Sequence, residues 1–144
     1  MSIEGLFQLA NLGVLPFWLM MIVLPTWSVT RRVIGSAWIA LVPALIYVLL
    51  VLPQVGVLLP ALSNPTAAGI AELLSTPAAA TIGWVHFLAF DLLVGRWAYL
   101  DARERQIHPL IMAPVLLLIF MFGPLGYLSY LIIRAIASRF GTRS

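Results

Sequence analysis

One apolar stretch of the sequence carries the side chains that could do chemistry. Residues 77–99 are mostly apolar, yet they include His86, Asp91 and Arg96. As a helix, this stretch rises about 1.5 Å per residue and is long enough to cross the roughly 30 Å of hydrocarbon in a bilayer. An ionisable side chain at that depth is costly unless it is paired or hydrated, and such groups usually serve a function. We therefore take these three residues as a candidate catalytic acid/base set.

The spacing within this stretch predicts which side chains share a face of the helix. Trp84 and Asp91 lie seven residues apart on one face, and Gly95 follows one turn later. Because Gly95 has no side chain, a ligand or a neighbouring helix could approach the backbone there. His86 lies about 140° around from Asp91, so the two cannot pair directly and would line two sides of a cavity or face two neighbours. Arg96 either extends toward the membrane interface or folds back on Asp91.

Composition assigns the chain to the membrane proteins. Of 144 residues, 62% are hydrophobic and 9% are charged, and the mean hydropathy is +1.07. A water-soluble core of this size could not bury so much apolar surface. The basic residues are all arginines and gather at the ends of hydrophobic runs, where they set topology and meet lipid head groups, so we expect no nucleic-acid partner. The lack of cysteine excludes thiolate metal sites, c-type haem and cysteine nucleophiles.

The hydrophobic runs predict an all-α, polytopic membrane bundle of about four transmembrane helices. Start signals at Asn64-Pro65 also predict a short interfacial helix between the second and third crossings. We expect one domain over residues 1–144, with helices at residues 6–27, 33–52, 77–99 and 109–137 and the interfacial helix at residues 65–75.

The last of these runs leaves two topologies open. As one helix, residues 109–137 would be about 40 Å or more in length, and Gly123-Pro124 lies in the middle. Splitting the run there would give a re-entrant pair. Four crossings with Arg31 and Arg32 inside would leave Arg134 and Arg139 outside, against the positive-inside tendency. The two internal loops nevertheless favour four crossings, which we take as the prediction.

Further residues could contact a substrate. Asn11 could serve either as a ligand or as an interhelical hydrogen bond, and buried amides in membrane helices favour the second interpretation. The two histidines are 22 residues apart in no metal-binding pattern. A b-type haem between His86 of two protomers would require a homo-oligomer, a state that the sequence leaves open, and we expect no cofactor and no metal. The candidates for substrate binding are Asn11, Trp18, Trp84, Gly95 and Arg134.

The chemistry that remains is proton transfer on an apolar ligand dissolved in the lipid bilayer. The pattern WxHxxAxDxxxGRW over residues 84–97 resembles the plant neoxanthin synthase family, small polytopic proteins named for an abscisic-acid-deficient phenotype. The resemblance covers nearly the whole chain. It also includes Gly123-Pro124-Leu125-Gly126, Asn11, Pro16-Phe17-Trp18, Pro25-Thr26-Trp27, Thr30, Gly69-Ile70-Ala71 and Ser75-Thr76-Pro77-Ala78.

The resemblance implies carotenoid isomerisation. In plants the family is implicated in converting violaxanthin to neoxanthin, which opens an epoxide and creates an allene without net redox change. An acid must protonate the epoxide oxygen and a base must remove a ring-side proton. By resemblance, Asp91 is the candidate acid or base, His86 the complementary group, and Arg96 the residue that tunes Asp91.

The residues at the start of the chain, Met1 to Glu4, show no transit peptide. We therefore expect a bacterial member in the inner (cytoplasmic) membrane, acting on a carotenoid or another isoprenoid.

The alternative is a protein without enzymatic activity that binds a carotenoid or lipid, or that assists assembly of a membrane complex. In that case the polar residues of the third run would hold helices together.

Overall fold

The protein is all-α, as the hydrophobic runs predicted. The computed structural model describes residues 2–140, so residue 1 and residues 141–144 of the expected domain lie outside the described part. Three helices within it are long and apolar enough to cross a membrane: α1 (Ile3–Val23), the run Ala37–Ser63 and α6 (Pro77–Glu104). The first ends four residues before its predicted end at residue 27, because the chain turns at Leu24–Trp27 into the short helix α2 (Ser28–Gly35).

The second apolar run extends further than predicted. It begins with a 3₁₀ turn, η1 (Ala37–Ala40), and continues as α3 (Leu41–Val51), the 3₁₀ turn η2 (Leu52–Gln54) and α4 (Val55–Ser63). Pro53 was expected to end the helix at residue 52, but it stands in the first turn of η2, where a missing N–H is tolerated. A short helix follows where one was predicted, α5 (Ala67–Leu73), capped by the Thr66 side chain. Its position relative to a bilayer remains a prediction.

The chain folds as two compact units. The first comprises residues up to Gly13 together with Leu41–Ala89, and the second comprises Val14–Ala40 together with Phe90 onward. Both α1 and α6 are continuous helices that contribute one part to each unit. All seven arginines of the described chain belong to the second unit.

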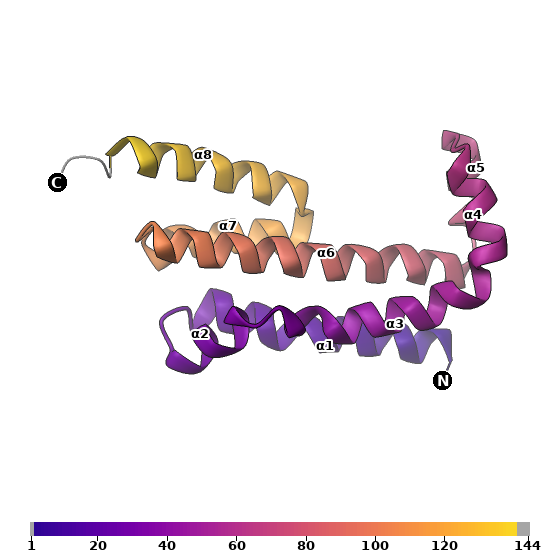
Figure 1. Cartoon of the computed structure of the whole chain (residues 1–144), viewed down its shortest axis with the longest axis horizontal. Coiled ribbons are helices and arrows are strands. Elements are labelled where there is room, and N and C mark those ends of the chain that lie inside the picture. Colours follow the sequence, from indigo (N-terminus) through magenta and orange to yellow (C-terminus); the bar gives the residue numbers. More distant parts are fainter. Residues whose placement is uncertain (1, 141–144) are drawn as a thin grey trace. The chain divides into compact units, whose positions relative to one another are not determined.

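The prediction of one helix over residues 109–137 is wrong. Two helices, α7 (Pro109–Phe122) and α8 (Pro124–Phe140), meet at Gly123 and pack against each other as a hairpin, and Figure 1 shows α8 turning back along α7. Gly123 has a positive φ of 29°, and the Pro124 that follows cannot donate a backbone hydrogen bond. The break falls at the glycine-proline pair that the re-entrant alternative had marked.

Candidate functional site

Asp91 lies near the middle of α6 and against the turn of the α7–α8 hairpin. It is the fifteenth of the 28 residues of the helix, about 21 Å along the axis from Pro77. A Cβ atom built on Gly123 would overlap the Asp91 Oδ1 and lie 3.2 Å from its Cγ. The glycine at the turn therefore leaves the space that the half-buried carboxyl group occupies.

Arg96 neither extends to the interface nor folds back on Asp91. Its Nε donates hydrogen bonds to the carbonyl oxygens of Ile34 (2.8 Å) and Ser36 (3.2 Å). Its Nη2 donates to the carbonyl oxygen of Gly35 at 2.6 Å. These carbonyls belong to the C-terminal end of α2, where a cation is also favoured by the helix dipole. Arg96 thus fastens α2 to α6, a contact that no spacing in the sequence indicates.

Replacing Arg96 by methionine should destabilise the second unit. The methionine keeps most of the apolar length but leaves three carbonyls, two of them in partly buried hydrogen bonds, without their charged donor, which we expect to cost about 2 kcal/mol. Unfolding of the purified protein by heat in a mild detergent, followed by circular dichroism, measures the loss. Arg31→Met is the matched control, because Arg31 is exposed on α2. Equal unfolding curves for the two variants would contradict the anchoring role.

His86 is exposed and lies among aromatic rings of the first unit. Its ring centroid is 5.5 Å from that of Tyr47 on α3 and 6.2 Å from that of Phe87. His86 belongs to the first unit and Asp91 to the second, although one continuous helix carries both residues.

Asn11 and Trp84, two of the predicted ligand residues, bind each other within the first unit. The Asn11 Oδ1 accepts a hydrogen bond of 3.0 Å from the Trp84 Nε1. The Asn11 Nδ2 donates to the Phe7 carbonyl oxygen at 2.7 Å, and the Phe7 ring packs 6.1 Å from that of Trp84. Asn11 therefore serves as the interhelical hydrogen bond that membrane helices commonly use.

Trp18 and Gly95 also contact each other, in the core of the second unit. Trp18 is 2% exposed, and its ring lies against Gly95 so closely that a Cβ atom there would overlap its Cη2. The Phe120 ring of α7 packs on Trp18 with centroids 5.2 Å apart. The predicted close approach at Gly95 is thus made by an indole ring of α1.

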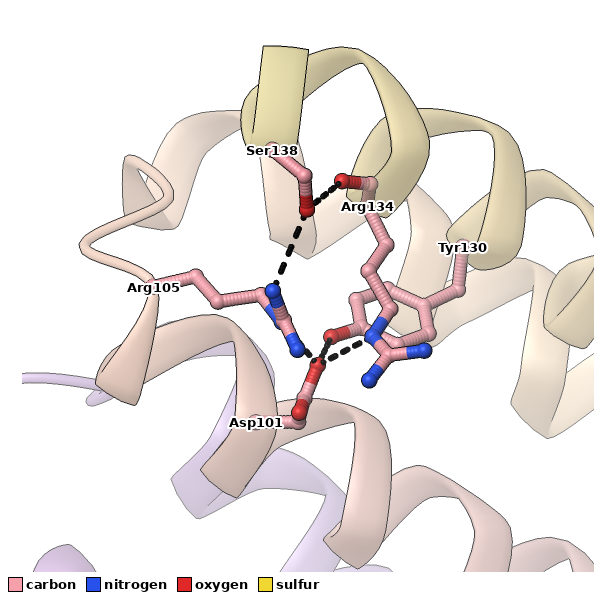
Figure 2. A network of polar contacts seen from close by, with 5 residues as sticks. All are labelled: Asp101, Arg105, Tyr130, Arg134 and Ser138. Carbon is pink, nitrogen blue, oxygen red and sulfur yellow. Dashed lines mark hydrogen bonds and ion pairs between the residues drawn. The ribbon is translucent and has the colours of Figure 1, made fainter. Parts of the chain in front are cut away.

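Arg134 belongs to a polar network that was only partly predicted. The Asp101 Oδ2 accepts hydrogen bonds from Arg105 Nε at 2.7 Å, from Arg134 Nε at 2.9 Å and from the Tyr130 hydroxyl, as Figure 2 shows. The hydrogen bond that the Arg105 guanidinium donates to the Asp101 carboxylate raises the pKa of Arg105. The spacing of four residues between Asp101 and Arg105 is typical of an ion pair on one face of a helix. The same spacing relates Tyr130, Arg134 and Ser138 on α8, and it is the signal that could have identified this face.

Comparison with known proteins identifies the family of this chain. A family model described as ABA DEFICIENT 4-like matches residues 5–130. The chain belongs to this family. The protein ABA DEFICIENT 4, chloroplastic, of Arabidopsis thaliana is 29% identical over 139 residues, covering 92% of this chain and 62% of the plant protein. The chain thus spans less than two thirds of that relative's length. No solved structure matches significantly.

The match confirms the resemblance to the abscisic-acid-deficient type family. With the three long apolar helices, it identifies the chain as a membrane protein. The ABA DEFICIENT 4-like region includes Asp91 and every substrate-binding candidate except Arg134, which lies beyond residue 130.

The second unit of this ABA DEFICIENT 4-like protein contains a small apolar cavity. Its volume is about 20 Å³, and Tyr99 and Arg103 lie in its wall. Both side chains donate to the Pro25 carbonyl oxygen, at 2.6 Å and 2.9 Å. A space of this size accommodates about one water molecule, so it cannot enclose a carotenoid.

Proposed function

We propose that this ABA DEFICIENT 4-like protein isomerises a carotenoid or a related isoprenoid within the membrane, with the Asp91 carboxyl group as its acid and base. The observation that carries the proposal is the position of this carboxyl, at mid-helix in α6 and against the Gly123 turn. Carboxyl groups at such depth are rare unless they serve a function. Arg96, the nearest candidate for neutralising Asp91, is instead engaged by the carbonyls at the end of α2.

In the proposed reaction, one carboxyl group both supplies and recovers the proton. A protonated Asp91 would donate its proton to the epoxide oxygen as the C–O bond breaks and a hydroxyl group forms. The resulting carboxylate would remove a proton from the carbon chain beside the ring, which completes the allene and restores the acid. No electron is gained or lost. In this scheme His86, five residues earlier on α6 and the complementary group that the resemblance implied, is not required for the proton balance.

The apolar surface beside the hairpin turn suits a long apolar ligand. Met121 and Phe122 immediately precede Gly123 and are 59% and 60% exposed, and Leu125 just after it is 54% exposed. We propose that the ligand lies along this surface among the lipids. Its epoxide end would then meet the carboxyl group at the turn.

The Asp91→Asn substitution tests this proposal. In a bacterial host that accumulates violaxanthin, the unchanged protein should produce a new isomeric peak in a pigment chromatogram. Asp91→Asn should abolish it, because an amide has nearly the shape of the carboxyl group but neither donates nor accepts a proton at neutral pH. Glu104→Gln is the matched control, since Glu104 is exposed at the end of the same helix.

Membrane expression of all variants is matched by immunoblot. An isomer peak that persists in Asp91→Asn would exclude Asp91 from the chemistry.

The second candidate function is carotenoid or lipid binding, or assembly of a membrane complex, without catalysis. It is favoured by the use of Arg96 and Asn11 to join elements of the protein. Pigment that co-purifies equally with the unchanged protein and Asp91→Asn, with no new isomer, would support this function.

For the topology, we propose three crossings followed by a hairpin that enters the membrane and returns to the same side. The supporting contacts join the C-terminal ends of α6 and α8, through Asp101 with Arg134 and Arg105 with Ser138. This arrangement places Arg134 and Arg139 on the same side of the membrane as Arg103 and Arg105 at the end of α6, in keeping with the positive-inside tendency. The helix α5 would then lie at the opposite interface.

A further inference from the structure

The face built around Asp101 carries more positive charge than its carboxyl groups neutralise. Asp101 forms ion pairs with Arg105 at 2.7 Å and with Arg134 at 2.9 Å, so one carboxylate serves two guanidinium groups. Arg139 follows five residues after Arg134, near the end of α8. The Asp101 cluster, defined as Asp101, Arg105, Tyr130, Arg134 and Ser138, therefore has a net charge of about +1 at neutral pH.

The two guanidinium groups of the cluster retain unused donors. Arg134 bonds Asp101 through Nε, and Arg105 uses Nε for Asp101 and Nη1 for the Ser138 hydroxyl. Within residues 2–140, the contacts of Arg134 with Asp101 use Nε and leave the Nη1 and Nη2 of Arg134 available to an anion, and the Nη2 of Arg105 bonds neither Asp101 nor Ser138. The two side chains are 37% and 32% exposed, so these donors can be reached from outside. Figure 2 shows the side chains of Arg105 and Arg134 both reaching the Asp101 carboxyl group.

The guanidinium of Arg134 is held in one orientation. Its Cζ lies 5.7 Å from the centroid of the Trp97 ring, while its Nε is fixed by Asp101. An arginine held in this way loses little conformational entropy when it binds an anion, and its planar donors match the geometry of phosphate.

The surroundings favour the phosphate of a lipid over a free anion. The Trp97 and Tyr127 rings lie 5.7 Å apart, and both side chains are exposed. Tyr127 is seven residues before Arg134, so it lies about two turns from Arg134 on the same face of α8. Exposed aromatic rings of this kind characterise the boundary between head groups and acyl chains.

We propose that Arg105 and Arg134 bind the phosphate of an anionic phospholipid, with its acyl chains along Trp97 and Tyr127. The site lies at the ends of α6 and α8 and not at Asp91, and it is independent of the proposed isomerisation. It narrows the general expectation that arginines meet lipid head groups to one site with defined partners, which the family match does not assign.

Lipid binding to the purified protein tests the proposal. The protein in an uncharged detergent is titrated with dioleoylphosphatidylglycerol or dioleoylphosphatidylcholine, and bound lipid is counted by native mass spectrometry. We expect tighter binding of phosphatidylglycerol. Arg134→Gln and Arg105→Gln should each weaken it by about tenfold, the effect of losing a charge-assisted hydrogen bond. Arg31→Gln and Arg32→Gln, which remove the same charge from exposed positions of α2, should leave it within about twofold.

Three results would overturn the proposal. If the α2 control variants weakened phosphatidylglycerol binding as much as Arg134→Gln and Arg105→Gln, the lipid would be attracted by the net charge of the protein alone. Displacement by excess inorganic phosphate would show a site for free anions. Equal binding of the two lipids would show that an anionic head group is not required. If Arg134→Gln fails to fold, Arg105→Gln still decides the outcome, because it leaves the Asp101 contacts with Tyr130 and Arg134 in place.

Discussion

Replacing Gly126 by alanine is expected to separate α7 from α8 and to cause the largest loss of stability of any small substitution in the hairpin. A Cβ atom at Gly126 would overlap the backbone nitrogen of Ile119 and lie 2.5 Å from the Ile119 Cα and the Leu118 carbonyl carbon. These are backbone atoms of α7 and cannot rotate away as a side chain could. The helices must therefore move apart, which we expect to cost about 3 kcal/mol.

Thermal unfolding in detergent, followed by circular dichroism, measures this loss. Gly56→Ala is the matched control, because a Cβ atom there meets no other atom within 4 Å. At a compatible helical position, alanine should be neutral or slightly stabilising. If Gly126→Ala unfolds at the same temperature as Gly56→Ala, the close packing of the hairpin is contradicted.

A cysteine at Ser138 is expected to react from the same side of the membrane as a cysteine at Ser28, and from the side opposite to a cysteine at Ser75. The chain has no native cysteine, so each single substitution gives an unambiguous signal. All three positions are exposed serines, for which cysteine is a close steric match. The expected pattern follows from the hairpin, which returns the end of α8 to the end of α6.

Labelling with a membrane-impermeant maleimide, applied to intact cells and to inverted vesicles, determines on which side of the membrane each cysteine is exposed. We expect nearly complete labelling of Ser138→Cys and Ser28→Cys in one preparation and of Ser75→Cys in the other. Labelling of Ser138→Cys together with Ser75→Cys would reject the hairpin topology and restore four crossings.

The parts of the fold that the sequence predicted depend on local patterns. The helix α6 begins at Pro77, where the helix over residues 77–99 was predicted to begin, and α5 follows the start signal at Asn64-Pro65. The prediction of a single helix over residues 109–137 was wrong because the hairpin depends on a contact between two helices and not on a local pattern. The apolar run over these residues is continuous. The close packing of Gly126 on Ile119, which stabilises the hairpin, forms only when α7 and α8 already lie side by side.

The residues of the candidate site could be predicted from their types, but the atoms that they contact could not. Asp91 was identified because a carboxyl group is rare in such a stretch, yet its neighbour Gly123 lies 32 residues later in the chain. Arg96 binds carbonyl oxygens about 60 residues earlier, and backbone carbonyls leave no mark in the sequence. Acceptors of this kind are found only when the tertiary structure is known.

The turn at Gly123 also bears on how the chain enters a membrane. If α7 and α8 crossed as one segment, Arg134 and Arg139 would have to pass through the hydrocarbon during insertion, against an inside-negative potential that opposes outward movement of each positive charge by about 2 kcal/mol per 100 mV. As a hairpin, the segment can enter with its apolar tip at Phe122–Leu125 leading. Every arginine of the described chain then stays on the side where it was synthesised.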